Sequence, residues 1–321
     1  MFFEEYYAGP EEPSGYGVFT GTLGNNDLGG GKRLVSTVDH IFLSDTLDGG
    51  ASVWMRETGS GDGTRAKRWF GPRDKSEEVP DDWPPISSLP AADVKSEAAD
   101  IPVRCRCRGV DLVFHHGQML ADFEGKPRTE IPRFIDPVTH KTLGSFDACN
   151  SCRLSLGTDV IYWTFVLLRH LSFPEGTAGR QEDLPLFPQT SADLKAAVLA
   201  QENRDPRFGT LSLYASSSDV QRYFCSRCSA TVFYACDEHV DDLDIAVGLL
   251  DAPDGARAES ILKWSLGATP SWRQDVVGGW RDGLFTDIVK EAEAWRIERG
   301  YPKGWRRAEL EEAKKKGETK D

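Results

Sequence analysis

Short apolar runs separated by turn-forming residues dominate the middle of the chain. Five of them are rich in β-branched and aromatic residues and are bounded by Gly, Asp, Ser or Pro. They are VDLVF (110–114), VIYWTFV (160–166), VQRYF (220–224), TVFYA (231–235) and DIAVGLL (244–250). This pattern predicts short antiparallel strands around a small core, which is a mainly β fold.

A different period follows the last of these runs. Between about 282 and 299 the apolar side chains recur every three or four residues, as on one face of a helix. The stripe consists of Leu284, Phe285, Ile288, Val289, Ala292 and Trp295, and Gly300 and Pro302 follow it. We therefore predict a C-terminal helix that ends before Gly300, followed by a charged tail, within 281–321.

The first hundred residues carry less pattern. Residues 57–101 are rich in Gly, Pro, Ser and charge, which predicts a flexible, partly extended linker. Before it, GVFTGTL (17–23) resembles IAVGLLD (245–251), and each is followed by a Gly-containing turn and another apolar stretch. Two interpretations remain open for residues 1–56: a partial internal repeat, or an unrelated hairpin with similar strand composition.

Composition and charge narrow the function classes. The 321-residue chain has a net charge of -13, which repels phosphate backbones and disfavours a nucleic-acid partner. No apolar run is long enough for a membrane span, and MFFEEYY at the start carries acids where a secretory signal has positive charge. These features predict a cytoplasmic protein with no membrane partner.

All seven cysteines lie between Cys105 and Cys236. Six of them form three close pairs, namely Cys105 with Cys107, Cys149 with Cys152, and Cys225 with Cys228. Two such pairs make one tetrahedral four-thiolate site, for which zinc is the leading ion. The alternatives are an iron-sulfur cluster, a thioredoxin-type redox pair, and buried cysteines that act as small apolar side chains.

The ordered motifs CRCRGVDLVF, DACNSCRLSLGTDVIYWTFV, LYASSSDVQRYFCSRCSATVFY and DIAVGLLDAP resemble a known family. This is the glutathione-dependent formaldehyde-activating enzyme (GFA) family, which includes centromere protein V and has the zinc-bearing β-tent fold. The resemblance covers about 105–272 and implies a GFA-type zinc domain over 102–280. Because duplicated domains occur in the family, it also favours 1–56 as a partial repeat that lacks the cysteine-bearing part.

The resemblance implies roles for particular residues. Cys105, Cys107, Cys225 and Cys228 would share a structural zinc. Cys149 and Cys152 would belong to a second, catalytic-type zinc site, where Asp147 replaces the family's first cysteine. Arg153 and Arg222 match the family's arginines after the middle cluster and before the last pair, and Ser229 replaces a glycine.

Asp147 separates two hypotheses about the second site. As a ligand it would give the metal a harder donor than a thiolate and make it a stronger Lewis acid. As an ordinary turn residue or cap it would accompany a degraded site. Cys236, His115, His116 and His239 are weaker candidate ligands.

Two functions follow from these hypotheses. The first is a carbon-sulfur lyase type enzyme acting on an adduct of an aldehyde with glutathione or another small thiol. In this hypothesis Asp147, Cys149 and Cys152 are the catalytic ligands and Arg153 contacts a substrate carboxylate. The alternative is a non-catalytic, zinc-stapled binding module. A third hypothesis, nucleic-acid binding as in the centromeric relative, conflicts with the acidic charge.

Overall fold

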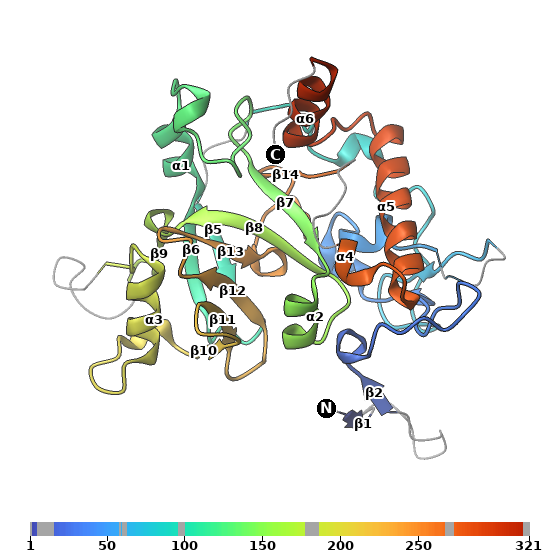
Figure 1. Ribbon diagram of the computed structural model, residues 1–321, viewed down its shortest axis with the longest axis horizontal. Coiled ribbons are helices and arrows are strands. Elements are labelled where there is room, and N and C mark those ends of the chain that lie inside the picture. Colours follow the sequence, from blue (N-terminus) through green and yellow to red (C-terminus); the bar gives the residue numbers. More distant parts are fainter. Residues whose placement is uncertain are drawn as a thin grey trace.

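The computed structural model describes residues 2–4, 16–57, 59, 63–95, 100–176, 186–266 and 273–316. Its main element is a seven-stranded sheet with the strand order β10-β11-β12-β13-β8-β7-β14 (Figure 1). All neighbours are antiparallel except β7 and β14, which are parallel. The strands are β7 (Thr142–Asp147), β8 (Ile161–Leu167), β10 (Leu211–Ala215), β11 (Val220–Cys225), β12 (Thr231–Cys236), β13 (Asp242–Ala246) and β14 (Leu262–Trp264).

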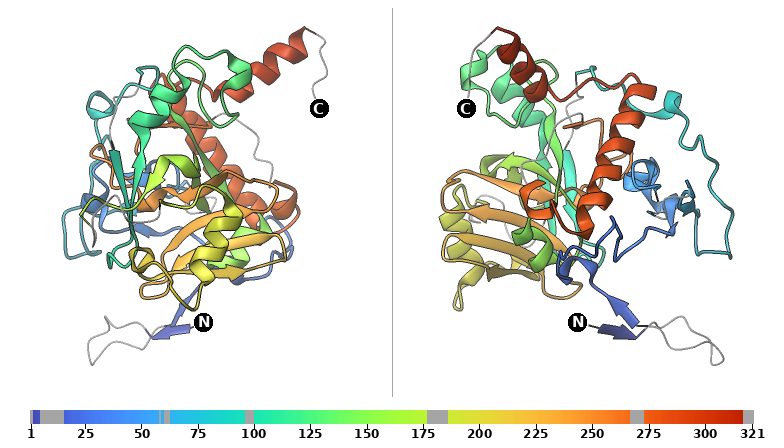
Figure 2. Two further views of the ribbon diagram at one scale, coloured as in Figure 1. Left: turned by 90° about the vertical axis from the view of Figure 1, so that its left-hand side faces the viewer. Right: turned by 45° about the vertical axis from the view of Figure 1, so that its right-hand side comes forward.

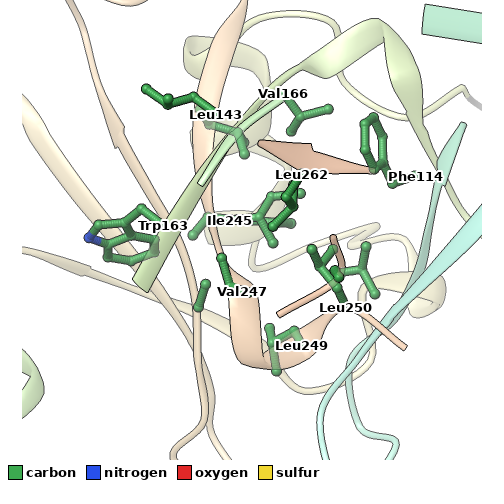
Figure 3. Close-up of a cluster of buried hydrophobic side chains, with 14 of the residues drawn as sticks. Phe114, Leu143, Trp163, Val166, Ile245, Val247, Leu249, Leu250 and Leu262 are labelled. Carbon is green, nitrogen blue, oxygen red and sulfur yellow. The ribbon is translucent and has the colours of Figure 1, made fainter. Parts of the chain in front are cut away.

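A second, three-stranded antiparallel sheet packs against the first. It consists of β5 (Asp100–Arg104), β6 (Asp111–His115) and β9 (Leu171–Ser172). Along β6 the buried side chains alternate with half-buried ones, as expected of a strand with one face in the core. Figure 3 shows Phe114 of β6 facing a cluster that includes Val166, Ile245 and Leu262 of the larger sheet. The main core therefore lies between the two sheets.

Six α-helices surround the sheets in the described part of the chain. They are α1 (His116–Phe123), α2 (Asn150–Leu156), α3 (Ser191–Leu199), α4 (Arg273–Val276), α5 (Trp280–Glu298) and α6 (Trp305–Lys315). Figure 1 shows α3 beside the edge strand β10 and α5 on the opposite side of the molecule. None of the described helices combines the length and the apolarity that a membrane crossing requires.

The N-terminal segment contributes to the same core. It contains β1 (Phe2–Glu4), β2 (Tyr16–Val18) and β3 (Asp39–His40). Figure 2 shows that the β1–β2 pair projects from the body, whereas the later part is packed against it. Trp54 is fully buried, and its ring centre lies 5.3 Å from those of Phe146 and Trp264. A buried network holds the preceding turn, where the Arg257 amide donates to the Asp48 carboxylate at 2.7 Å.

The region 57–101 differs from the extended spacer that its composition predicts. It contains β4 (Lys67–Arg68), which pairs with β3, and Ala66 and Trp69 are buried. Arg68 is 2% exposed and donates to the carbonyl oxygens of Trp83 and Asp81 at 2.9 and 3.1 Å. Residues 58, 60–62 and 96–99 of this region lie outside the described part. A few long side chains that bind backbone carbonyls order this region, and a search for apolar periodicity does not detect them.

The predicted elements correspond closely to the observed ones where the pattern was periodic. The four runs at 110–114, 160–166, 220–224 and 231–235 coincide with β6, β8, β11 and β12. The predicted helix at 282–299 is α5, which begins two residues earlier at Trp280. The run 244–250 was only partly right, because the strand β13 ends at Ala246 and a 3-10 turn covers Val247–Leu249. With its additional helices, the fold is mixed α/β rather than mainly β.

Candidate metal centre

Four cysteines from the two sheets meet at one end of the core. Cys105 follows β5, Cys107 lies in the next turn, Cys225 ends β11, and Cys228 lies in the turn before β12. Their sulfurs lie within 4.8 Å of one another, and all are free thiols. The Cys107 sulfur is 3.6 Å from that of Cys105 and 3.5 Å from that of Cys225. These spacings match the sulfur-sulfur edge of roughly 3.8 Å in a tetrahedron with zinc-sulfur bonds of about 2.3 Å.

Backbone and hydroxyl donors surround the sulfurs of this cluster. The amide of Val110 lies 3.3 Å from the Cys105 sulfur, and the amide of Cys228 lies 3.4 Å from that of Cys225. The Thr210 hydroxyl is 3.0 Å from the Cys225 sulfur. Burial raises the pKa of Cys225, but hydrogen bonds from the Thr210 hydroxyl and from the amides of Cys228 and Arg227 outweigh it and lower the pKa to about 6. The turn is thus prepared to hold at least one thiolate.

The second predicted group also comes together. Asp147 ends β7, Cys149 caps α2, and Cys152 lies in the first turn of that helix. Their ligand atoms lie within 4.8 Å of one another. The amide of Cys152 points at the Cys149 sulfur at 3.3 Å, and the Cys152 sulfur lies 3.6 Å from Oδ2 of Asp147. The strand-to-helix turn therefore presents two sulfurs and one carboxylate to a common point.

The two oxygens of Asp147 have different partners. Oδ1 accepts a hydrogen bond from the Cys149 amide at 2.7 Å, which is the turn-stabilising contact typical of aspartate. Oδ2 faces the Cys152 sulfur and is the oxygen that a metal would use. Each of the two hypotheses for Asp147 thus describes one of its oxygens.

The two thiols of this group have pKa values that are shifted in opposite directions. The hydrogen bond from Cys152 lowers the pKa of Cys149, with the Cys152 amide acting in the same direction. The same hydrogen bond raises the pKa of Cys152, and burial and the Asp147 charge raise it further. Without a cation, a second thiolate would therefore be strongly unfavourable here. A divalent ion removes this conflict, since it binds both sulfurs as thiolates.

Arg222 lies directly behind the second group, a position that the pattern of apolar runs did not single out. Its side chain is buried, with Nη1 3.7 Å from the Cys152 sulfur and Nη2 donating to the Ser151 hydroxyl at 2.6 Å. No carboxylate of the described residues forms an ion pair with it. The Cys152 sulfur is the group beside this guanidinium that becomes an anion when a metal holds it as a thiolate. In the sequence, Arg222 stood out only as the match to the arginine that precedes the last cysteine pair in the family that the chain resembles.

Arg153, the predicted substrate contact, is packed between α2 and the N-terminal segment. It is 5% exposed, and its guanidinium donates to the carbonyl oxygen of Leu23 at 2.9 Å and to Oδ1 of Asn150 at 2.6 Å. It also binds the carbonyl oxygen of Gly21. These contacts use the donors of Arg153 to hold the N-terminal segment on α2. Among the weaker candidates, His239 pairs with Asp242 at 3.2 Å and belongs to neither cysteine group.

Comparison with known proteins gives no family for this chain. No protein-family description matches it, and no curated protein is similar enough to count as a relative. The two ligand groups therefore rest on the geometry of this chain alone. They define a protein with two cysteine-rich groups, each of which could hold a metal ion such as zinc.

Proposed function

We propose that this protein is a zinc protein of the GFA type and that its second metal site works on adducts of thiols and aldehydes, as a carbon-sulfur lyase. In this proposal the two sheets correspond to the β-tent. The observation that carries it is the three-ligand group of Asp147, Cys149 and Cys152, set apart from a four-thiolate group. A site with three protein ligands leaves a position for a substrate, whereas a site with four is closed.

The donor sets of both groups suit zinc. Four thiolates at tetrahedral spacing fit a structural ion, and two thiolates with one carboxylate fit a catalytic one. When bound at the second site, zinc would lower the pKa of a coordinated thiol and so supply a thiolate at neutral pH. Arg222 would balance the surplus negative charge of three anionic ligands around a divalent ion.

The N-terminal segment is proposed to be a partial repeat of the zinc domain. Its strand β2 is followed by a 3-10 turn at Thr20–Thr22, just as β13 is followed by the turn at Val247–Leu249. The next stretches differ, since 43–46 is a 3-10 turn and 262–264 is the strand β14. The shared order of strand and turn supports the repeat over a short stretch only.

Metal analysis tests the second site directly. The purified protein should contain about two zinc ions per chain, and Cys149→Ala should retain about one. Cys236→Ala is the matched control, because Cys236 lies outside both groups and its loss should leave the metal content unchanged. A wild-type protein that holds a single zinc would refute the second site.

Arg222 offers a test that does not depend on catalysis. Arg222→Met removes the cation beside Cys152, and the second zinc should then be released at a lower chelator concentration than in the wild type. Arg222→Lys keeps the charge and should restore part of the retention. Equal retention in all three proteins would contradict the charge-balance argument.

The non-catalytic module is the second candidate, and two observations favour it. Oδ1 of Asp147 accepts a hydrogen bond that stabilises the turn, and the guanidinium of Arg153 already donates to backbone carbonyls of the N-terminal segment. The two candidates differ in their response to a thiol. In cobalt-substituted protein, glutathione should shift the cobalt absorption bands if the second site accepts a thiolate. Unchanged bands at millimolar glutathione would favour the module.

A further inference from the structure

A cavity of about 340 Å³ lies on the sheet face that carries Arg222. Residues paired across neighbouring antiparallel strands project from the same face. Arg222 pairs with Tyr234, Tyr234 with Asp244, and Asp244 with Phe165. Tyr234, Asp244 and Phe165 line the cavity together with Phe134, whose ring stacks on that of Phe165 with centres 5.8 Å apart.

The cavity adjoins the second ligand group. The Arg222 guanidinium stands 5.1 Å from the centre of the Tyr234 ring, and its Nη1 lies 3.7 Å from the Cys152 sulfur. One arginine and one ring therefore separate the cavity wall from the sulfur. Arg222 thus connects the ring that lines the cavity to the ligand group, whose three residues do not themselves line the cavity.

Asp244 is an acidic residue that lines the cavity. Its carboxyl is half-buried, and no hydrogen bond or ion pair joins it to another described residue. Burial raises its pKa well above the usual range, and the charges of Asp242 and Asp147 raise it further against the opposing charges of Arg133 and Arg222. The other charged or titratable groups that line the cavity are Glu238, His239, Cys236 and Arg306. The carboxyl therefore favours its protonated form more than an exposed aspartate does, and it lines the cavity.

We propose that this cavity binds an aldehyde with an aromatic substituent, and that Asp244 exchanges a proton with the carbonyl oxygen of that aldehyde. The inference rests on the proposed function, because it supplies the second substrate of the same site. Formaldehyde, with a volume similar to that of one water molecule, would leave most of the cavity unused. The rings of Phe134, Phe165 and Tyr234 instead offer apolar faces to a substituent.

The proton balance of the reaction gives Asp244 a defined task. As the thiol sulfur adds to the carbonyl carbon, a carbon-sulfur bond forms and the carbonyl π pair moves to oxygen. That oxygen takes the proton of the Asp244 carboxyl and becomes the hydroxyl of the hemithioacetal. The proton that the thiol loses then returns to the Asp244 carboxylate through water. Cleavage of the adduct follows the same steps in reverse.

A binding experiment tests the cavity without any catalysis. 4-Fluorobenzyl alcohol carries an aromatic ring and a hydroxyl on the neighbouring carbon, as the hemithioacetal of an aromatic aldehyde does. Its ¹⁹F NMR signal should broaden and shift on titration with the full chain. Phe165→Ala should weaken binding about tenfold, and Phe165→Leu, which keeps apolar volume without the ring, should weaken it less. Phe70→Ala is the matched control, because Phe70 is also half-buried but does not line the cavity. No binding, or equal binding by the Phe165 variants, would overturn the proposal.

A second experiment tests the role of Asp244. Asp244→Asn should bind the fluorinated alcohol within about twofold of the wild type, since the amide keeps the size and the hydrogen-bonding capacity of the carboxyl. In this variant, hemithioacetal formation from glutathione and benzaldehyde should slow by roughly 100-fold or more. Its pH-rate profile should also lack the decrease that deprotonation of Asp244 causes in the wild type. An unchanged rate and pH profile would overturn its role.

The two proposals fail in distinguishable ways. If the alcohol binds with the predicted response to Phe165→Ala but glutathione leaves the cobalt bands unchanged, the thiol function is refuted and the aromatic site stands. If glutathione shifts the bands but the alcohol does not bind, the thiol function stands and the aromatic subsite is refuted.

Discussion

The four-cysteine group should contribute a large share of the folding free energy, and Cys225→Ala measures it. The Cys107 and Cys225 sulfurs are adjacent although 118 residues separate them in the chain. On the loop-closure scale used for disulfides, a cross-link of this length removes about 5 kcal/mol of chain entropy from the unfolded state. A domain of ordinary stability has roughly 5–15 kcal/mol in total. Loss of the ion would therefore lower the melting temperature by on the order of 10 °C.

The assay combines zinc analysis with urea unfolding of Cys225→Ala, Cys236→Ala and wild type. Cys225→Ala should lose one zinc ion and several kcal/mol of the free energy of unfolding. Cys236→Ala removes a half-buried thiol outside both groups and should cost about 1 kcal/mol. The reasoning is refuted if Cys225→Ala keeps its full metal content, or if it is no less stable than Cys236→Ala.

Three further predictions concern the rest of the chain. A Cβ on Gly21 would overlap the backbone of Thr158, so Gly21→Ala should lower the free energy of unfolding in urea by roughly 1–3 kcal/mol. Gly24→Ala is the control and should be nearly neutral, because the nearest atom to a Cβ there is 3.5 Å away. Arg281 is fully buried and donates to the Asp159 carboxylate at 2.8 Å, so Arg281→Met should lower the free energy of unfolding by roughly 3–5 kcal/mol and expose residues 19–25 to protease. Arg273→Met, which removes a surface ion pair, should do neither. Equal stability within either pair would contradict these assignments. Burial lowers the pKa of three histidines, so the unfolded chain binds more protons at these residues, and their contribution to the free energy of unfolding should fall as the pH is lowered from about 7 to about 5. They are His40, His140 and His170. His170→Asn should therefore lose less of its free energy of unfolding than the wild type as the pH is lowered over this range. An equal or larger loss would contradict that sign.

The strands were predictable where burial on one face imposes a regular pattern. In β6 the buried side chains alternate with half-buried ones, whereas the buried run of β11 includes Gln221 and Arg222, so that strand was recognised by its β-branched and aromatic residues. The end of β13 was not predictable, because Val247 and Leu249 are buried within a 3-10 turn as they would be within a strand. The order of 57–101 was missed for another reason, since Arg68 organises it through carbonyl oxygens rather than apolar contacts.

Part of the candidate site was likewise predictable from the sequence and part was not. The pairing of the cysteines was visible in the sequence, because metal ligands on one turn have short, characteristic spacings. The assignment of Arg153 as a substrate contact came from its match to the arginine after the middle cluster in the family that the chain resembles. In the fold its guanidinium turns to the N-terminal segment, and the arginine that contacts the Cys152 sulfur is Arg222, which lies on another strand.

The sequence by itself determined which residues could serve as ligands and which segments alternate as strands, because both depend on contacts between residues a few positions apart. Only the tertiary structure decided which of them meet. The closure of Cys105 and Cys107 on Cys225 and Cys228, the burial of Trp54 from the N-terminal segment in the core, and the alignment of Asp244 with Arg222 all depend on sheet register. Register is set by the packing of whole faces, and no local window of the chain contains that information.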